Sequence, residues 1–169
     1  MSVRNCGKLV AALISLLCAA PSAVAATCPQ VGEEAVICAI NAQRRAAELA
    51  PVSVNPKLAL AARRHARDMV RRQYFSHTTL GGRSMVDRLT AAGYLTRGIG
   101  RWAVGEVLAW GSGPLGTPAS AVDAWMHSPP HRRVLLYPAY REIGVGIEPG
   151  TPFAKPGATF AAELGSTGP

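Results

Sequence analysis

Three residues of this chain carry side chains suited to chemistry in surroundings that are unusual for them: His77, Glu106 and His131. An imidazole changes its charge near neutral pH, so it can accept a proton or bind a metal. A carboxylate can serve as an anionic partner or as a metal ligand. The three residues are far apart in the sequence, so the elements that carry them decide whether they meet.

His131 lies in the stretch W-M-H-S-P-P-H-R-R-V-L-L, residues 125–136. Ser128 is a preferred N-cap residue, and the two prolines that follow suit a first helical turn, where backbone N–H groups lack partners anyway. The pattern predicts a short helix that Pro138 ends, with His131 in its first turn. Because a helix N-terminus carries partial positive charge, we expect a neutral imidazole there.

Glu106 lies in a stretch from Trp102 to Trp110 whose residues alternate as in a strand. The bulky side chains that share its face are those of Trp102, Val104, Leu108 and Trp110. An unpaired buried carboxylate is costly. We therefore expect Glu106 to be paired, protonated or metal-bound, and an ion pair with a nearby arginine is the structural alternative to a metal site.

His77 follows the aromatic residues of Y-F-S at 74–76 and enters a loop, where it can point into a cleft. The helix before it begins with Asn55 as N-cap and Pro56 in its first turn. Apolar residues of that helix recur at i, i+3 and i+4 over four turns. His65 lies within this stripe, where a histidine is more often a satisfied core residue than a ligand.

Helices dominate the first half of the sequence and alternating strands the second half. The further predicted helices span about 33–49, 85–92 and the region after Thr117, and the further strands lie at 143–147 and 158–164. This order is typical of an α+β domain rather than of alternating βαβ units. In the strand at 143–147, glycines alternate with Ile and Val, which predicts a nearly side-chain-free face against a neighbouring element.

The first 25 residues have the pattern of a secretory signal peptide, with a basic start, a short apolar run and an A-x-A site at 23–25. An uncleaved membrane anchor is the alternative. Cleavage would leave residues 26–169 as a single domain with no stable membrane span. From this signal peptide we expect a secreted protein, extracellular or periplasmic. Because those compartments are oxidising, Cys28 and Cys38 are predicted to form a disulfide.

The formal net charge is +8, and the loss of Arg4 and Lys8 with the signal peptide lowers it to about +6. Such an excess can favour anionic surfaces or nucleic acid. The arginines lie on predicted helices without the interleaved aromatics of a nucleic-acid platform. We therefore expect a solvated helix face and no nucleic-acid partner.

The motifs resemble the bacterial branch of the CAP superfamily, which includes cysteine-rich secretory proteins, antigen 5 and plant pathogenesis-related class 1 proteins. The main match is W-x-x-S-P-x-H-R followed by L-x-x-P-x-Y-x-x-I-G-V-G, residues 125–146. Other matching pieces, in the family's order, are Asn41 and Arg44, His65 to Met69, Phe75-Ser76-His77, Gly93-Tyr94 and Gly105 to Ala109. The resemblance implies a three-layer α-β-α sandwich with a small, mainly antiparallel central sheet.

The resemblance also implies a cleft lined by histidines and acidic residues, in which His77, Glu106 and His131 match the family's S-H, G-E and S-P-x-H motifs. Two neutral imidazoles and a carboxylate suit zinc or a similar divalent cation, the one cofactor predicted. Ser128 stands where many animal and plant members carry a second glutamate, and Val107 replaces the asparagine of G-E-N. The predicted supporting residues are Asn41, Arg44, Trp125, Ser128 and Arg132.

Three classes of function stay open at this point. The preferred class is a secreted binding module for a metal, a lipid or a cell-envelope component. The second is a metal-assisted hydrolase with His77 or His131 as base; a serine nucleophile at Ser76 or Ser128 is disfavoured, because sequence neighbours rarely face each other. The third is an extracellular interaction protein whose polar cluster is merely buried. The resemblance does not choose among them, because one fold hosts many activities.

Overall fold

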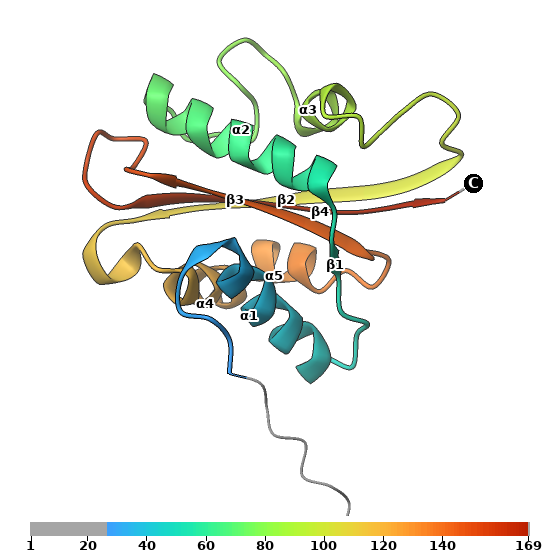
Figure 1. The fold of residues 1–169 in the computed structure, drawn as a ribbon, viewed down its shortest axis with the longest axis horizontal. Helices are drawn as coiled ribbons and strands as arrows, with labels where there is room; N and C mark the ends of the chain where they lie inside the picture. Colours follow the sequence, from blue (N-terminus) through green and yellow to red (C-terminus); the bar gives the residue numbers. More distant parts are fainter. Residues whose placement is uncertain (1–26, 169) are drawn as a thin grey trace, which may run out of the picture.

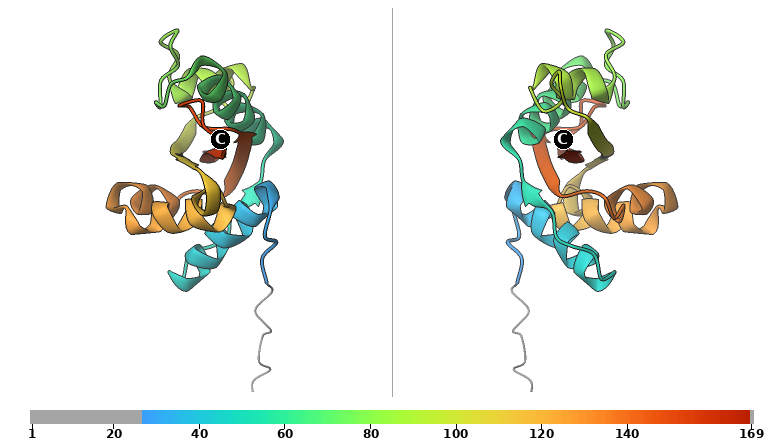
Figure 2. Two further views of the ribbon diagram at one scale, coloured as in Figure 1. Left: turned by 90° about the vertical axis from the view of Figure 1, so that its left-hand side faces the viewer. Right: turned by 90° about the vertical axis from the view of Figure 1, so that its right-hand side faces the viewer.

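A four-stranded sheet forms the middle layer of the computed structural model, which describes residues 27–168 (Figure 1). The predicted signal peptide therefore lies outside the described residues. One face of the sheet is covered by α2 (Pro56–Arg72) and α3 (Met85–Ala91). The other face is covered by α1 (Gly32–Ala46), α4 (Pro118–His127) and α5 (Pro129–Leu135). This is the α+β, three-layer arrangement that the resemblance implied, and end-on views show the same layers (Figure 2).

The sheet has the order β1-β3-β4-β2, formed by β1 (Ser53–Val54), β2 (Arg101–Gly111), β3 (Glu142–Pro149) and β4 (Ala158–Gly168). The long pairs β3–β4 and β4–β2 are antiparallel, whereas β1 pairs with β3 in parallel. The sheet is thus mixed, although most of its pairing is antiparallel as expected. No strand was predicted at β1, because a strand of two residues has no alternation to detect.

The main hydrophobic core lies between the sheet and the α1–α4–α5 layer. Trp125, one of the predicted supporting residues, is 1% exposed, and its Nε1 donates a hydrogen bond to the Leu108 carbonyl oxygen at 2.9 Å. Its largest buried neighbours in this core include Ile40, Leu135, Ile143, Phe160 and Leu164. Trp125 therefore supports the fold of this layer.

Helix α2 lies directly on β3 because two glycines of the strand leave room for it. A Cβ atom added to Gly144 would lie 2.0 Å from the Ala59 nitrogen, and one added to Gly146 would lie 2.3 Å from the Arg63 nitrogen. No side chain fits at either position without a shift of helix backbone. This confirms the expected side-chain-free strand face and fixes the height of α2 above the sheet.

Local signals define the ends of the two helices on this face. Asn55 accepts hydrogen bonds from the Lys57 and Leu58 nitrogens, as an N-cap should. Ser84 and Asp87 form a capping box at the start of α3. On the other face, the predicted disulfide between Cys28 and Cys38 is present and anchors the N-terminal segment to α1, with a Cα–Cα distance of 5.6 Å.

Two of the predicted supporting residues, Asn41 and Arg44, bind backbone groups on the α1 side of the sheet. Asn41 exchanges hydrogen bonds with the nitrogen and oxygen of Val52, at 2.8 and 2.9 Å. Arg44 is fully buried and donates to the carbonyl oxygens of Ala50, Leu135, Tyr137 and Tyr140. Both residues tie α1 to the segments around it.

Within residues 27–168 no helix is both long and apolar enough to span a membrane.

Candidate functional site

Glu106 lies near the middle of β2 and points toward the α2–α3 layer, since Leu108 on the same strand face packs against α2. Its side chain is 2% exposed. One carboxylate oxygen, Oε1, lies 2.6 Å from His77 Nδ1, and the other accepts a hydrogen bond from Arg88 Nη2. The ion pair with an arginine, which the sequence left open as an alternative, is therefore the arrangement in the structure.

His77 lies between the buried carboxylate of Glu106 and solvent. Its side chain is 59% exposed, although its Nδ1 is held by Glu106. The hydrogen bond to Glu106 raises the pKa of the His77 imidazole, against a smaller opposing effect of burial. The family match implied a neutral ring at this position; the structure instead favours the imidazolium, because the carboxylate beside it stabilises the charge.

Arg88, which was not predicted from the sequence, connects His77 and Glu106 into one polar cluster. It is buried on the inner face of α3, where Nη1 donates to the His77 carbonyl oxygen at 2.7 Å and Nη2 donates to Glu106. A signal for it was present in the helical period. Arg88 lies three residues after Met85 and four before Ala92, both of which pack against the core, so it faces inward with them.

Glu163 is the second carboxylate of the cluster and was also missed. It is fully buried on β4, directly opposite Glu106 in the β2–β4 register. Burial, followed by the nearby charge of Glu106, raises the pKa of Glu163 well above its ordinary value, so the group is a neutral acid. Arg88 Nη2 lies 3.6 Å from its Oε1. A lone carboxylate in an alternating apolar strand was the available signal, the same one that marked Glu106.

His65 is a buried neighbour of the same cluster, as the apolar stripe predicted. Its Nε2 lies 2.9 Å from the Ser76 carbonyl oxygen and 3.8 Å from Glu106 Oε2. Desolvation by burial lowers the pKa of the His65 ring, so the ring is neutral. Because a carbonyl oxygen can only accept, Nε2 carries the proton, and the acceptor Nδ1 has no partner in the described part of the chain.

His131 is the third residue of α5 and lies in the opposite helix layer. Burial, and then the charge of His77, lowers the pKa of the His131 ring. The direction of this shift favours the neutral ring that was expected. The structure therefore brings His77 and Glu106 into contact and leaves His131 within electrostatic range of His77.

Ser128 occupies the N-cap position of α5 but makes no capping hydrogen bond with its side chain. Its Oγ lies 2.8 Å from His131 Nδ1 instead. The expectation that these sequence neighbours would not face each other was wrong, because three residues of a first helical turn bring them onto one side. Arg132, the remaining supporting residue, lines a surface groove with Pro129 and Pro138, away from Glu106.

The cluster does not fit a divalent cation in this arrangement. Within residues 27–168, no group of three or more His, Cys, Asp or Glu side chains is placed to hold a metal. Both oxygens of Glu106 are engaged, one of them by the positive Arg88 guanidinium. The raised pKa of His77 also opposes ligation, because an imidazolium has no free lone pair to offer.

Comparison with known proteins agrees with this architecture. The model of the cysteine-rich secretory protein family, CAP, matches residues 37–160. The chain belongs to the CAP family. The matched range includes His77, Glu106 and Arg88, and it ends three residues before Glu163.

Individual relatives of this CAP chain are bacterial. It is 34% identical over 133 residues to the uncharacterized protein YkwD of Bacillus subtilis (strain 168), which covers 78% of this chain and 47% of the relative. The chain therefore spans about half the length of that relative. Among solved structures, an extracellular protein with an SCP domain from Bacillus anthracis str. Ames aligns at a TM-score of 0.63, with 22% identity over 76% of this chain and 38% of the other. An outer surface protein from Borrelia burgdorferi aligns at 0.66, with 18% identity over 84% and 100%.

Proposed function

We propose that this CAP domain is an extracellular binding module whose ligand docks on His77, above the buried Glu106 and Arg88. The observation that carries the proposal is a largely exposed imidazole fixed on a buried carboxylate. Glu106 holds the ring in one orientation, and Nε2 makes no hydrogen bond in the described part of the chain. Nε2 is thus a preorganised donor, and a ligand that binds it loses little conformational entropy. Since the pKa of His77 is raised, this donor carries positive charge over a wider pH range than a free histidine.

An extracellular location has three supports. The predicted signal peptide and the disulfide between Cys28 and Cys38 both suit an exported chain. Two structurally similar proteins are described as extracellular or as outer surface proteins. A component of the bacterial cell envelope is therefore the ligand class that we favour.

The test is retention of the mature chain, residues 26–169, on washed envelopes of a Gram-positive and a Gram-negative bacterium. The matched variants are His77→Ala and His127→Ala, because His127 is an exposed histidine on α4, in the opposite layer. We expect His77→Ala to lose most of the retention and His127→Ala to keep it. Equal retention of the two variants would remove His77 from the binding surface.

A hydrolase is the second candidate function, and one contact favours it. Ser128 Oγ lies 2.8 Å from a neutral His131 ring, which is the geometry of a nucleophile beside its base. Among the hydrogen bonds of the described residues, no third group orients His131 through its Nε2. A serine-reactive fluorophosphonate that labels the mature chain, but not Ser128→Ala, would place the hydrolase first.

A further inference from the structure

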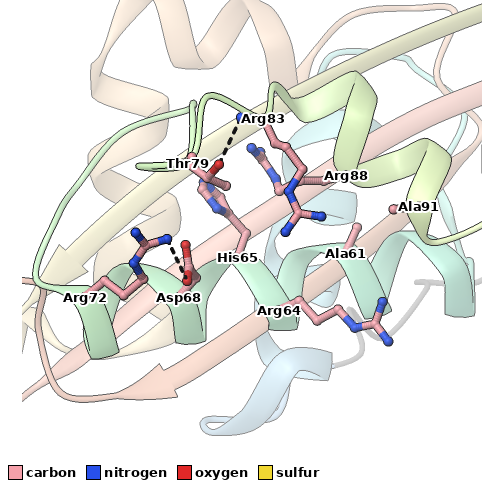
Figure 3. A pocket seen from close by; sticks show the side chains of 10 residues that line it. Ala61, Arg64, His65, Asp68, Arg72, Thr79, Arg83, Arg88 and Ala91 are labelled. Carbon is pink, nitrogen blue, oxygen red and sulfur yellow. Dashed lines mark hydrogen bonds and ion pairs between the residues drawn. The ribbon is translucent and has the colours of Figure 1, made fainter.

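A second feature of the α2–α3 layer is a cavity of about 270 Å³ beside the cluster (Figure 3). Its charged lining consists of Arg64, Arg72, Arg83, Arg88, His65 and Asp68. His65 points from α2 toward the loop that carries Thr79, and Arg83 reaches back from the end of that loop. The cavity shares Arg88 with the cluster, but His77 is not among its lining residues.

The charges at the mouth of the cavity are not balanced. Arg72 lies 3.9 Å from Asp68, and Arg88 is engaged by Glu106. Arg64 and Arg83 are exposed, and neither makes an ion pair within residues 27–168. Two free guanidiniums at one opening favour an anionic group with several acceptor oxygens, because the planar fork of arginine matches phosphate and carboxylate.

Two residues that line the cavity carry buried polar atoms without partners in the described part of the chain. Arg88 Nε and His65 Nδ1 are both buried and make no hydrogen bond in the described structure. Such atoms are uncommon in native proteins, since each forfeits its hydration without compensation. Arg88 Nε can only donate, whereas His65 Nδ1 accepts because Nε2 donates to Ser76. A hydroxyl group can both accept and donate a hydrogen bond. The hydroxyl groups of a ligand could therefore accept from Arg88 Nε and donate to His65 Nδ1.

The size of the cavity limits what can bind. Its volume is just below the usual range of ligand pockets, roughly 300–1,000 Å³, which corresponds to a short-chain molecule. Ala61 and Ala91 add small apolar walls. From this burial pattern we expect the charged end of a ligand at the exposed Arg64 and Arg83 and a hydroxyl end toward the buried His65 and Arg88.

We propose that this cavity binds a small hydroxylated phosphate ester of the size of glycerol phosphate, free or as the headgroup of a larger envelope molecule. A phosphate suits two free guanidiniums better than a single carboxylate does, because it offers more charge and more oxygens. The proposal goes beyond the binding surface at His77 and depends on it only in treating the α2–α3 layer as the ligand-facing side.

The first experiment is titration calorimetry of the mature chain with glycerol 3-phosphate. We expect saturable binding, and about tenfold weaker binding of n-propyl phosphate, which lacks the hydroxyls, and of glycerol, which lacks the charge. Arg64→Ala and Arg83→Ala should each weaken glycerol phosphate binding by about tenfold. Arg45→Ala removes an equal charge from an exposed position on α1, in the other layer, and should leave it unchanged.

The second experiment distinguishes the two sources of the phosphate. Vesicles that contain phosphatidylglycerol should retain the chain, and glycerol 3-phosphate should release it, if the ligand is a headgroup; binding of glycerol 3-phosphate without vesicle retention identifies a free ester. Absence of glycerol 3-phosphate binding, or equal binding by n-propyl phosphate, would overturn the inference. Envelope retention that depends on His77 would persist after such a result, so the two proposals fail separately.

Discussion

Within residues 27–168, each face of the sheet buries one arginine, and the two arginines have different partners. On the α1 side, every hydrogen bond that Arg44 donates ends on a backbone carbonyl oxygen, which carries no titratable charge. On the α2 side, Arg88 donates to a carbonyl of the His77 segment and to the carboxylate of Glu106, with Glu163 also within 3.6 Å. A buried guanidinium is thus a structural link on one face and part of a titrating cluster on the other.

The packing around the two arginines follows the same division. The α1–α4–α5 face has one continuous hydrophobic core that includes Trp125. The α2–α3 face has two smaller hydrophobic clusters, and Glu106, Glu163 and His65 are buried on the same side. Apolar burial stabilises the first face, whereas charge pairing on the second face maintains groups that a ligand can use.

The largest expected effect comes from Arg88→Met. Removing the guanidinium leaves the buried Glu106 without its arginine partner, and breaking a buried ion pair costs about 3–5 kcal/mol of unfolding free energy near pH 7. Arg44→Met should also destabilise the protein, but its partners do not titrate. Urea unfolding from pH 5 to 8 should therefore show a loss that grows with pH for Arg88→Met and a constant loss for Arg44→Met. Parallel pH profiles for the two variants would remove the distinction between the faces.

Trp125→Ala should lower the unfolding free energy by about 3–5 kcal/mol, since it empties a fully buried site. The loss should be similar at pH 5 and pH 8, because no titratable side chain bonds to this ring. Calorimetric unfolding at pH 5 and pH 8 measures this loss of unfolding free energy. An unchanged melting temperature would show that Trp125 does not support the core.

The two cross-strand carboxylates should respond in opposite ways to neutralisation. Glu163 has a raised pKa, so its native proton is retained while the unfolded chain loses it, and its contribution falls as pH rises above the ordinary value of 4.5. Glu163→Gln removes this dependence and should gain stability relative to wild type as pH rises. Glu106 has a lowered pKa, so Glu106→Gln should lose stability at neutral pH and approach wild type in acid. Urea titrations that give both variants the same slope would reject this assignment.

The smallest effect is expected for Ser128→Ala. The side chain of Ser128 makes no capping bond, so only its contact with His131 is lost, at a cost of about 1 kcal/mol or less. A larger loss by thermal unfolding would mean that the serine caps α5 after all.

The sequence predicted those features that depend on local patterns. The cap at Asn55, the helix after residue 84, the strand β2 and the glycine face of β3 are all present in the structure. The two-residue β1 was missed, because its pairing with β3 is a property of the tertiary fold.

The missed parts of the site are those that depend on contacts between distant segments. The opposition of Glu106 to Glu163 follows from the β2–β4 register, which no local pattern specifies. Arg88 was inward-facing by period, but its choice of Glu106 required the placement of α3 over β2. The raised pKa of His77 likewise depends on Glu106, which lies on a distant strand.

The most direct test of this account is the pKa of His77, measured from its ring proton resonances by NMR. We expect a value above the ordinary 6.5 in the mature chain, with His131 below 6.5. In Glu106→Gln the pKa of His77 should fall, because the carboxylate that stabilises the imidazolium is gone. A His77 pKa at or below 6.5 in the wild-type chain, or one that Glu106→Gln leaves unchanged, would contradict a charged, carboxylate-anchored imidazole as the basis of the site.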